Sequence, residues 1–362
     1  MANVEADPAV SRVTTQLGMT VKRSYVARRI TLLAVAAMAA VAATTVLLVT
    51  VQNQAPPPRH QLRVERTARQ VSAAGASATA FAITPNGRTA YVITAGGTVT
   101  PVNLATRKPG RPIKVGDSAS VIAISPNGRT AYLPNHGVSG NGDTVSTIRL
   151  AVGKPGGRIK VGADPDTMAI TPNGRTAYVG NYLGNSLTPI TLATNKPGSP
   201  IKLGFKPWNL AITPNGRTAY VVNNNADTVI PVTLATGKLG RPIKVGRRAV
   251  AIAITPNGRT AYVENNVGNT VTPITLATGK PGHPIKVGRS PNKIVITPNG
   301  KTAYVIDSRE ASDNVTPINL VTNKPEPRLK VSKANAIAIA PKGGTAWVLS
   351  GSGTKLVPIR IG

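Results

Sequence analysis

The chain has 362 residues, of which 43 are lysine or arginine and 13 are aspartate or glutamate, so its formal net charge at pH 7 is +30. Cysteine is absent, which excludes disulfides, a thiol nucleophile, a thiolate zinc site and a lipid anchor on cysteine. So large a positive charge favours anionic partners, although basic side chains that are merely solvated on turns would give the same composition.

The first 61 residues contain a single long apolar segment. Residues 30–51 form a run of 22 residues without a charge, which is long enough to cross a membrane as a helix. Residues 1–29 precede it with four basic residues among their last eight, so the positive-inside rule predicts a short cytoplasmic tail and the rest of the chain outside. A cleaved signal peptide, which would release a secreted protein, is the alternative, but the run exceeds the usual apolar length of about 7–15 residues. Residues 52–61 are rich in proline and predict a stiff linker.

From residue 62 onward the chain is repetitive, and variants of the phrase ITPNGRTAYV recur along it. The central residues of successive Pro-Asn-Gly turns are 41, 46, 42, 42, 42 and 43 residues apart, counting a degenerate seventh copy. A period in the low forties, built of short strands and Gly/Pro turns, is typical of a β-propeller. Seven copies therefore predict an all-β, seven-bladed β-propeller over residues 62–362. The turns occupy residues 85–87, 126–128, 172–174, 214–216, 256–258, 298–300 and 341–343.

A single copy is enough to predict the strands of a blade. In the fifth copy, residues 251–255 are small and apolar and predict an inner strand. A Pro-Asn-Gly turn at 256–259 leads to a second strand at 260–265, because Pro presets the turn entry and Asn and Gly accept positive φ. A third strand at 270–276 and an outer strand at 284–287 complete the blade.

The two ends of the repeat region complement each other. The last copy stops after its third strand, at 355–361, and lacks a fourth. Residues 62–72 precede the first inner strand, at a place where every other copy has an outer strand. We therefore predict that residues 62–72 supply the outer strand of the seventh blade and so remove its open edge.

Short signatures recur within the copies. The pattern Tyr-Val-x-Asn occurs at 178–181, 220–223 and 262–265, and several third strands read Thr-Val-x-Pro. With the Pro-Asn-Gly turn, these features resemble the YVTN family of β-propeller repeats over residues 62–362. The resemblance implies a propeller at a bacterial or archaeal surface or in a periplasm. It implies no single activity, because the family ranges from surface-layer proteins to relatives of lactonases and haem-binding propellers. Three blades depart from the signature at its Asn position, with Thr94, Asp307 and Ser350.

The antiparallel strand order assigns the loops to two faces. All Pro-Asn-Gly and Lys-Pro-Gly turns are expected on one face, which we call the PNG face, and the other loops on the opposite one, the loop face. Acidic residues are concentrated in the segments of the loop face. We predict that the PNG face binds anionic membrane lipid or wall polymer, and that the linker at 52–61 brings it to the membrane. The predicted anion-binding residues are Arg88, Arg129, Arg175, Arg217, Arg259 and Lys301.

Two aromatic residues break the repeat on the loop face. Phe205 and Trp208 stand in an inter-blade loop where other copies have small or polar residues, and Tyr182 follows a nearby second strand. With residues that end neighbouring second strands, they predict a pocket for a sugar or peptide, and an envelope protein is a further expected partner. Aromatic side chains that simply fill a gap are the alternative interpretation. The predicted pocket residues are Asn181, Tyr182, Phe205, Trp208, Asn223, Asn265 and Asp307.

Little in the sequence favours catalysis, and no catalytic residue, metal site or cofactor is predicted. The three histidines fall in the linker and on opposite faces, which separates them too far to share a metal. Glu264 and Asp307 on adjacent blades suit a lactonase-like hydrolase with paired carboxylates, which is the alternative to a binding module. A nucleic-acid binder is another alternative through salt-dependent phosphate contacts, but twelve aromatic residues, six of them repeat tyrosines, are few for base stacking. The expected function is a non-catalytic binding or scaffold module at the cell envelope, of undetermined oligomeric state.

Overall fold

In the computed structural model, every secondary-structure element of the described residues is a β-strand. The described residues contain no helix that is long and apolar enough to cross a membrane. The predicted tail at 1–29, span at 30–51 and linker at 52–61 lie outside the described residues. Residues 62–362 form one compact unit. The described residues are 71–72, 78–94, 97–116, 118–137, 140–308, 314–350 and 355–361.

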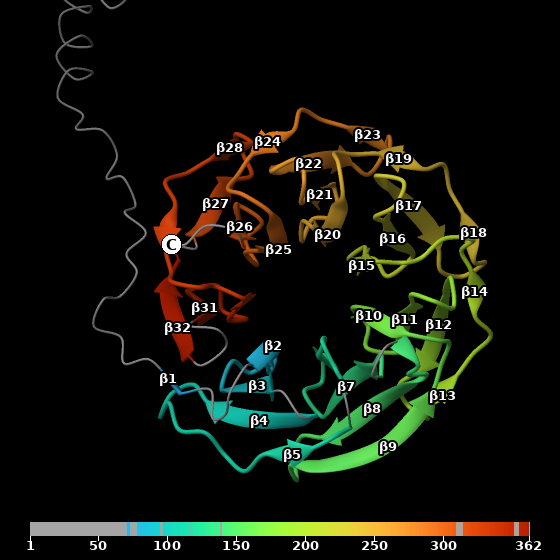
Figure 1. Ribbon diagram of the computed structural model, residues 1–362, viewed down its shortest axis with the longest axis vertical. Coiled ribbons are helices and arrows are strands. Elements are labelled where there is room, and N and C mark those ends of the chain that lie inside the picture. Colours follow the sequence, from blue (N-terminus) through green and yellow to red (C-terminus); the bar gives the residue numbers. More distant parts are fainter. Residues whose placement is uncertain are drawn as a thin grey trace, which may run out of the picture. The chain divides into compact units, whose positions relative to one another are not determined.

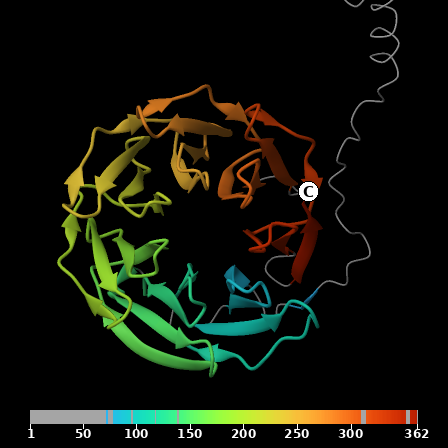
Figure 2. The same ribbon diagram turned by 180° about the vertical axis from the view of Figure 1, so that it is seen from behind.

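The strands form seven antiparallel sheets, or blades, arranged in a ring (Figure 1, Figure 2). The fold is therefore an all-β, seven-bladed propeller, as the repeat predicts. Each blade begins with a strand next to the central axis. The seven first strands are β2 (Ala78–Ile83), β6 (Ala123–Ile124), β10 (Pro165–Ile170), β15 (Asn209–Ile212), β20 (Ala249–Ile254), β25 (Pro291–Ile296) and β30 (Ala336–Ile339).

The second and third strands of every blade are six residues long and pair along their whole length. The second strands are β3 (Thr89–Thr94), β7 (Thr130–Asn135), β11 (Thr176–Asn181), β16 (Thr218–Asn223), β21 (Thr260–Asn265), β26 (Thr302–Asp307) and β31 (Thr345–Ser350). The third strands are β4 (Thr98–Asn103), β8 (Thr144–Arg149), β12 (Ser186–Thr191), β17 (Thr228–Thr233), β22 (Thr270–Thr275), β27 (Asn314–Asn319) and β32 (Lys355–Arg360).

The outer strands are short, and in four blades they are split in two. The outer strand predicted at 284–287 covers only Ile285–Lys286, and a separate two-residue strand precedes it at Lys280–Pro281. Proline explains the break, since Pro284 lacks the amide hydrogen that would continue the ladder. Arg158 replaces this proline in blade 2 and Gly157 precedes it, and there the outer strand is continuous. In blade 6 Arg328 stands at the same position, but Pro327 precedes it and the strand is split. The outer strands are β5 (Ile113–Lys114), β9 (Lys154–Lys160), β13 (Lys196–Pro197), β14 (Ile201–Lys202), β18 (Lys238–Leu239), β19 (Ile243–Lys244), β23 (Lys280–Pro281), β24 (Ile285–Lys286), β28 (Lys324–Pro325) and β29 (Leu329–Lys330).

An N-terminal strand closes the ring. β1 (Val71–Ser72) pairs antiparallel with β32, with Val71 opposite Leu356 and Ser72 opposite Lys355. Blade 7 therefore combines three C-terminal strands with one N-terminal strand (Figure 1). This confirms the predicted closure for residues 71–72, and the rest of the predicted strand, 62–70, lies outside the described residues.

The Pro-Asn-Gly turns are built alike in six blades and touch one another around the ring. In blade 5, Asn257 Oδ1 accepts hydrogen bonds from Thr255 Oγ1 at 2.7 Å and from the Arg259 amide at 3.0 Å. Gly258 has a φ of +68°, and a Cβ placed there would lie 3.3 Å from Pro214 in the turn of blade 4. Equivalent Gly–Pro contacts link all seven turns, including the degenerate one, in which Gly343 faces Pro298. The PNG face is therefore centred on a continuous ring of turns.

The core lies between blades, and the repeat tyrosines cross these interfaces. Val271 of blade 5 belongs to the same buried cluster as Val305 and Ile318 of blade 6. Tyr262 is 2 % exposed within this cluster, and its hydroxyl donates to Asn323 Oδ1 of blade 6 at 2.7 Å. A propeller built this way buries its apolar surface only when neighbouring blades are present.

Candidate functional site

The basic residues of the Pro-Asn-Gly turns form a ring, which we call the basic ring, on the PNG face. Each backbone amide is held by the turn Asn, as in Arg217, whose amide donates to Asn215 Oδ1 at 3.0 Å. The side chains are exposed. The turns therefore fix the backbone position of each basic residue and leave its charged group in solvent. The members of the basic ring are Arg88, Arg129, Arg175, Arg217, Arg259 and Lys301.

Lysines of the outer strands add a second set of cations on the same face. They lie where the chain turns from the third strand into the outer strand, and all are exposed. Of the seven acidic residues in the described ranges, only Glu326 lies beside these turns, and the other six lie in loops or strand ends towards the loop face. The field of the PNG face is therefore strongly positive. These lysines are Lys108, Lys154, Lys196, Lys238, Lys280 and Lys324.

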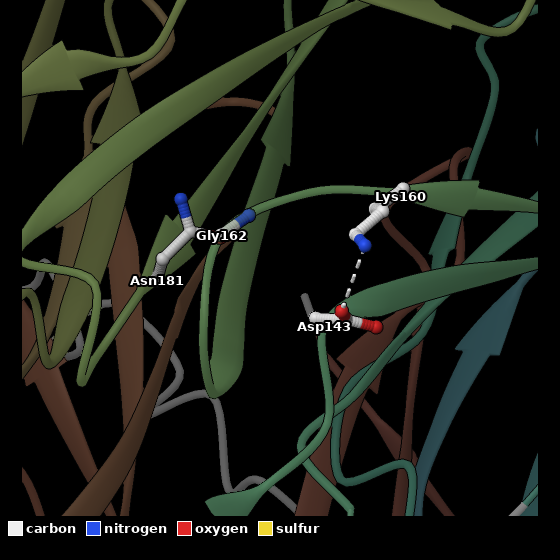
Figure 3. Close-up of polar contacts among 4 residues, drawn as sticks. All are labelled: Asp143, Lys160, Gly162 and Asn181. Carbon is white, nitrogen blue, oxygen red and sulfur yellow. Dashed lines mark hydrogen bonds and ion pairs between the residues drawn. The ribbon is translucent and has the colours of Figure 1, made fainter.

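Within the described residues, one salt bridge is formed, and it lies away from the basic ring. Lys160 Nζ is 3.7 Å from Asp143 Oδ2, beside the loop that enters blade 3 (Figure 3). Both side chains are largely exposed, so this pair contributes little to stability. The basic ring has no such carboxylate partner among the described residues.

The buried repeat asparagines at the ends of second strands are structural. Asn181 is fully buried, and its Nδ2 donates to Ser186 Oγ at 3.0 Å and to Thr188 Oγ1 at 2.8 Å. Its Oδ1 accepts from the amide of Gly162 at 3.2 Å, and Figure 3 shows these two residues. Asn265 is equally buried and makes the matching bonds to Thr270 and Thr272. These side chains tie the third strand and the inter-blade loop to the second strand.

The predicted aromatic residues do lie together on the loop face. The rings of Tyr182 and Trp208 meet edge to face, with centroids 5.8 Å apart and planes at 74°. Lys206 Nζ lies 5.0 Å from the centroid of the Tyr182 ring. Phe205 packs against the apolar cluster between blades 3 and 4, which agrees with the gap-filling interpretation for this residue.

A cavity of about 470 Å³ opens on the loop face at the central axis. Its lining comes from blades 2 to 6, and Trp208 is the only member of the predicted pocket that lines it. Asn181, Tyr182, Phe205, Asn223, Asn265 and Asp307 lie outside this cavity. Sequence reasoning missed its charged residues, Asp166, Arg248 and Lys293. For Asp166 and Lys293 the available signal was a departure from the repeat, because the aligned positions of the other blades hold neutral residues, whereas the position of Arg248 is charged in other blades too, as with Asp164 and Lys206.

Bulges at the start of the first strands aim residues into this cavity. In β10 the register shifts between Pro165 and Thr167, which leaves Asp166 unpaired, and in β25 it shifts between Pro291 and Lys293, which leaves Asn292 unpaired. A bulge bends its strand and re-aims a side chain. Asp166 accepts a hydrogen bond from Ser120 Oγ at 3.2 Å. Just outside the cavity, partial burial raises the pKa of Asp164, and the charge of Asp166 adds to this, whereas His136 and Lys206 oppose it.

Glu264 and Asp307, the candidate carboxylate pair, are both fully buried. Asp307 Oδ2 accepts from Thr316 Oγ1 at 2.5 Å, in the way that the repeat asparagines bond to their third strands. Neither Glu264 oxygen has a hydrogen-bond partner in the described part of the chain. Burial raises the pKa of Glu264 well above its ordinary value, Asp307 raises it further, and Lys293 lowers it. Both carboxyls lie beneath the surface and outside the cavity, so they offer no open face to a substrate.

The described residues contain no group of three His, Asp or Glu side chains placed to hold a metal ion. His136 lies on the loop face and His283 beside an outer strand of blade 5, in agreement with the predicted separation. His60 lies outside the described residues.

Comparison with known proteins shows the fold of the chain but neither its family nor its activity. No protein-family model matches the chain, and no curated protein matches it. Among solved structures, a chain of Kuenenia stuttgartiensis hydrazine synthase is similar, with a TM-score of 0.70 and 19 % sequence identity over 83 % of this chain and 99 % of that one. At this identity the likeness supports the seven-bladed propeller and says nothing of activity.

Proposed function

We propose that the protein is a non-catalytic binding module at the cell envelope, whose PNG face binds anionic membrane lipid or wall polymer. The observation that supports this most is the basic ring, six exposed cations carried on turns that touch one another around the axis. A flat ring of cations suits an extended polyanionic surface. Each Lys or Arg near an anionic membrane contributes on the order of 1 kcal/mol within a Debye length of about 8 Å.

The chain direction supports an orientation towards the membrane. β32 begins on the loop face, and β1 runs antiparallel to it, so β1 enters blade 7 from the PNG side. We propose that the apolar segment at 30–51 is a membrane anchor and that the linker at 52–61 leads from it to the PNG face. The blades would then be of the YVTN type, as their signatures at 178–181, 220–223 and 262–265 suggest.

The test compares two variants that lose the same charge from different surfaces. Residues 62–362, which form one compact unit, are mixed with vesicles containing phosphatidylglycerol or only phosphatidylcholine. One variant replaces the six residues of the basic ring with Gln. The other replaces the six lysines that end the outer strands, on the rim of the propeller, with Gln. These rim lysines are Lys114, Lys160, Lys202, Lys244, Lys286 and Lys330.

We expect salt-dependent binding to phosphatidylglycerol vesicles, lost in the basic-ring variant and retained in the rim variant. Equal loss in both variants would show that net charge alone drives binding and would contradict the proposal. Duplex DNA added as a competitor tests whether the protein binds nucleic acid instead. A nucleic-acid binder would release the vesicles at low DNA concentration.

A further inference from the structure

We propose that the axial cavity on the loop face is a second binding site, which takes a small hydroxylated carboxylate of the sugar-acid type. This site is separate from the basic ring, because its lining residues stand at the opposite ends of the blades. Its volume of about 470 Å³ falls in the range of about 300–1,000 Å³ that is usual for small-molecule sites.

Two cations on adjacent blades provide the carboxylate-binding side. Arg248 precedes the first strand of blade 5, Lys293 belongs to the first strand of blade 6, and both line the cavity. Neither forms an ion pair with another described residue. Lys293 is exposed although it stands on an inner strand, and the aligned residues of blades 5 and 7 are alanines. A carboxylate between the two cations would gain charge-assisted hydrogen bonds.

The opposite wall has the reverse charge and sets the orientation of the ligand. Asp166 projects from the bulge of β10 and is held by Ser120. Its carboxylate would repel an anionic group and accept a hydrogen bond from a hydroxyl. A ligand with a carboxylate at one end and hydroxyls at the other matches this polarity, whereas a dicarboxylate does not.

Trp208 supplies a flat wall between the two charged sides. Its ring meets the ring of Tyr182 edge to face, and Lys206 Nζ lies over the Tyr182 ring. An indole held in place in this way suits the apolar face of a sugar ring. Asn266 is fixed by its bond to the Pro291 carbonyl at 3.0 Å. Asn292 also lines the cavity, and its buried Oδ1 has no hydrogen-bond partner among the described residues, so a ligand hydroxyl would satisfy it once the side chain turns towards the cavity.

The experiment uses sodium glucuronate as the probe and the full-length chain in a mild non-ionic detergent. The chain has only two tryptophans, and Trp347 is 7 % exposed in the core between blades 7 and 1. A change in tryptophan fluorescence on titration therefore reports on Trp208, and Trp208→Phe should abolish it. We expect a saturable change, with the Kd raised at least about tenfold by Lys293→Gln and by Arg248→Gln. Isothermal calorimetry provides a second measurement that does not depend on the indole.

Controls separate a specific site from a general response to anions. Lys286→Gln removes the same charge from the rim of blade 5 and should leave the Kd unchanged. Lys293→Arg should keep most of the affinity. Absence of saturable binding by both fluorescence and calorimetry would overturn the proposal. Glucose binding as tightly as glucuronate would overturn the role of the cations, and acetate binding as tightly would overturn the role of the indole.

Discussion

At the scale of single residues, Glu264 is the strongest departure from the repeat. Its position on the second strand is occupied in blades 1, 4, 6 and 7 by Ile93, Val222, Ile306 and Leu349, all of which are buried. A carboxyl placed in this layer loses its hydration without gaining a hydrogen bond in the described part of the chain, which destabilises the folded state.

Glu264→Ile should therefore stabilise the propeller, and the gain should grow with pH. A raised pKa means that folded Glu264 keeps a proton that the unfolded chain releases above about pH 4.3. The stability of the wild type consequently falls, relative to the variant, as pH rises from there through the folded pKa, by up to about 1.4 kcal/mol per pH unit. Urea unfolding of both proteins at several pH values between about 4 and 8 measures the gap.

Glu264→Gln is the matched control for the charge. It keeps the shape and polarity, so it should remove the pH-dependent part of the gap and recover less stability than Ile. Asp307 and Lys293 are unchanged in both proteins, so the two differ only in the side chain at position 264. A gap that stays constant across the pH range would contradict this account of the carboxyl.

The repeat asparagines permit a second test at the same scale. Asn265 is fully buried and donates to Thr270 and Thr272, whereas Asn223 is half-buried at the equivalent position. Asn265→Ala should cost about 1–3 kcal/mol, because the threonine hydroxyls lose their buried partner, and Asn223→Ala should cost clearly less. Urea unfolding compares the two variants, and equal losses would show that the motif owes its value to something other than these bonds.

At the scale of elements, the turns explain why the repeat is so regular. The Pro-Asn-Gly sequence satisfies its own backbone groups and also contacts the turn of the preceding blade. A substitution there therefore disturbs both the turn itself and its contact with the neighbouring blade. Gly258 has a positive φ and little room for a side chain. Gly157 in β9 lies outside the positive-φ region, and a Cβ added to it would meet no atom within 4 Å.

Gly258→Ala should therefore destabilise the propeller by about 1–3 kcal/mol, since alanine is strained in the left-handed region and its methyl group presses on Pro214. Gly157→Ala should be neutral or slightly stabilising, because it lowers the entropy of the unfolded chain. Thermal unfolding of the two variants checks this contrast. A harmless Gly258→Ala would mean that the turns adjust independently of one another.

The elements are predictable from the sequence to the extent that they repeat. Strand order recurs in every copy and the Pro-Asn-Gly turn in six of the seven, so the seven blades and the closing strand can be inferred. The cavity cannot be inferred from the sequence, because residues such as Asp166 reach it through bulges that depend on the pairing of two strands. Asn181 and Asn265 are buried and bonded to their third strands, which the motif does not reveal, because it shows where they are in the chain and not which way their side chains point.

At the scale of the whole molecule, stability depends on closing the ring. Blades share their cores with their neighbours, so the edge of blade 7 cannot be left open without consequence. β32 pairs with β1 through Lys355 and Leu356, and Leu356 and Ile359 of this strand are fully buried.

Deleting residues 62–72 should therefore make the protein aggregate. The deletion removes β1 and exposes the edge of β32, which becomes a template for pairing with another chain. Deleting the predicted linker at 52–61 shortens the chain by a similar amount and leaves β1 in place, so it should keep the protein monodisperse in detergent. Light scattering and thermal unfolding compare the two deletions. If the 62–72 deletion stayed monodisperse and melted as cooperatively as the wild type, β1 would be dispensable, and the sharing of cores between the other blades would be enough to hold the ring.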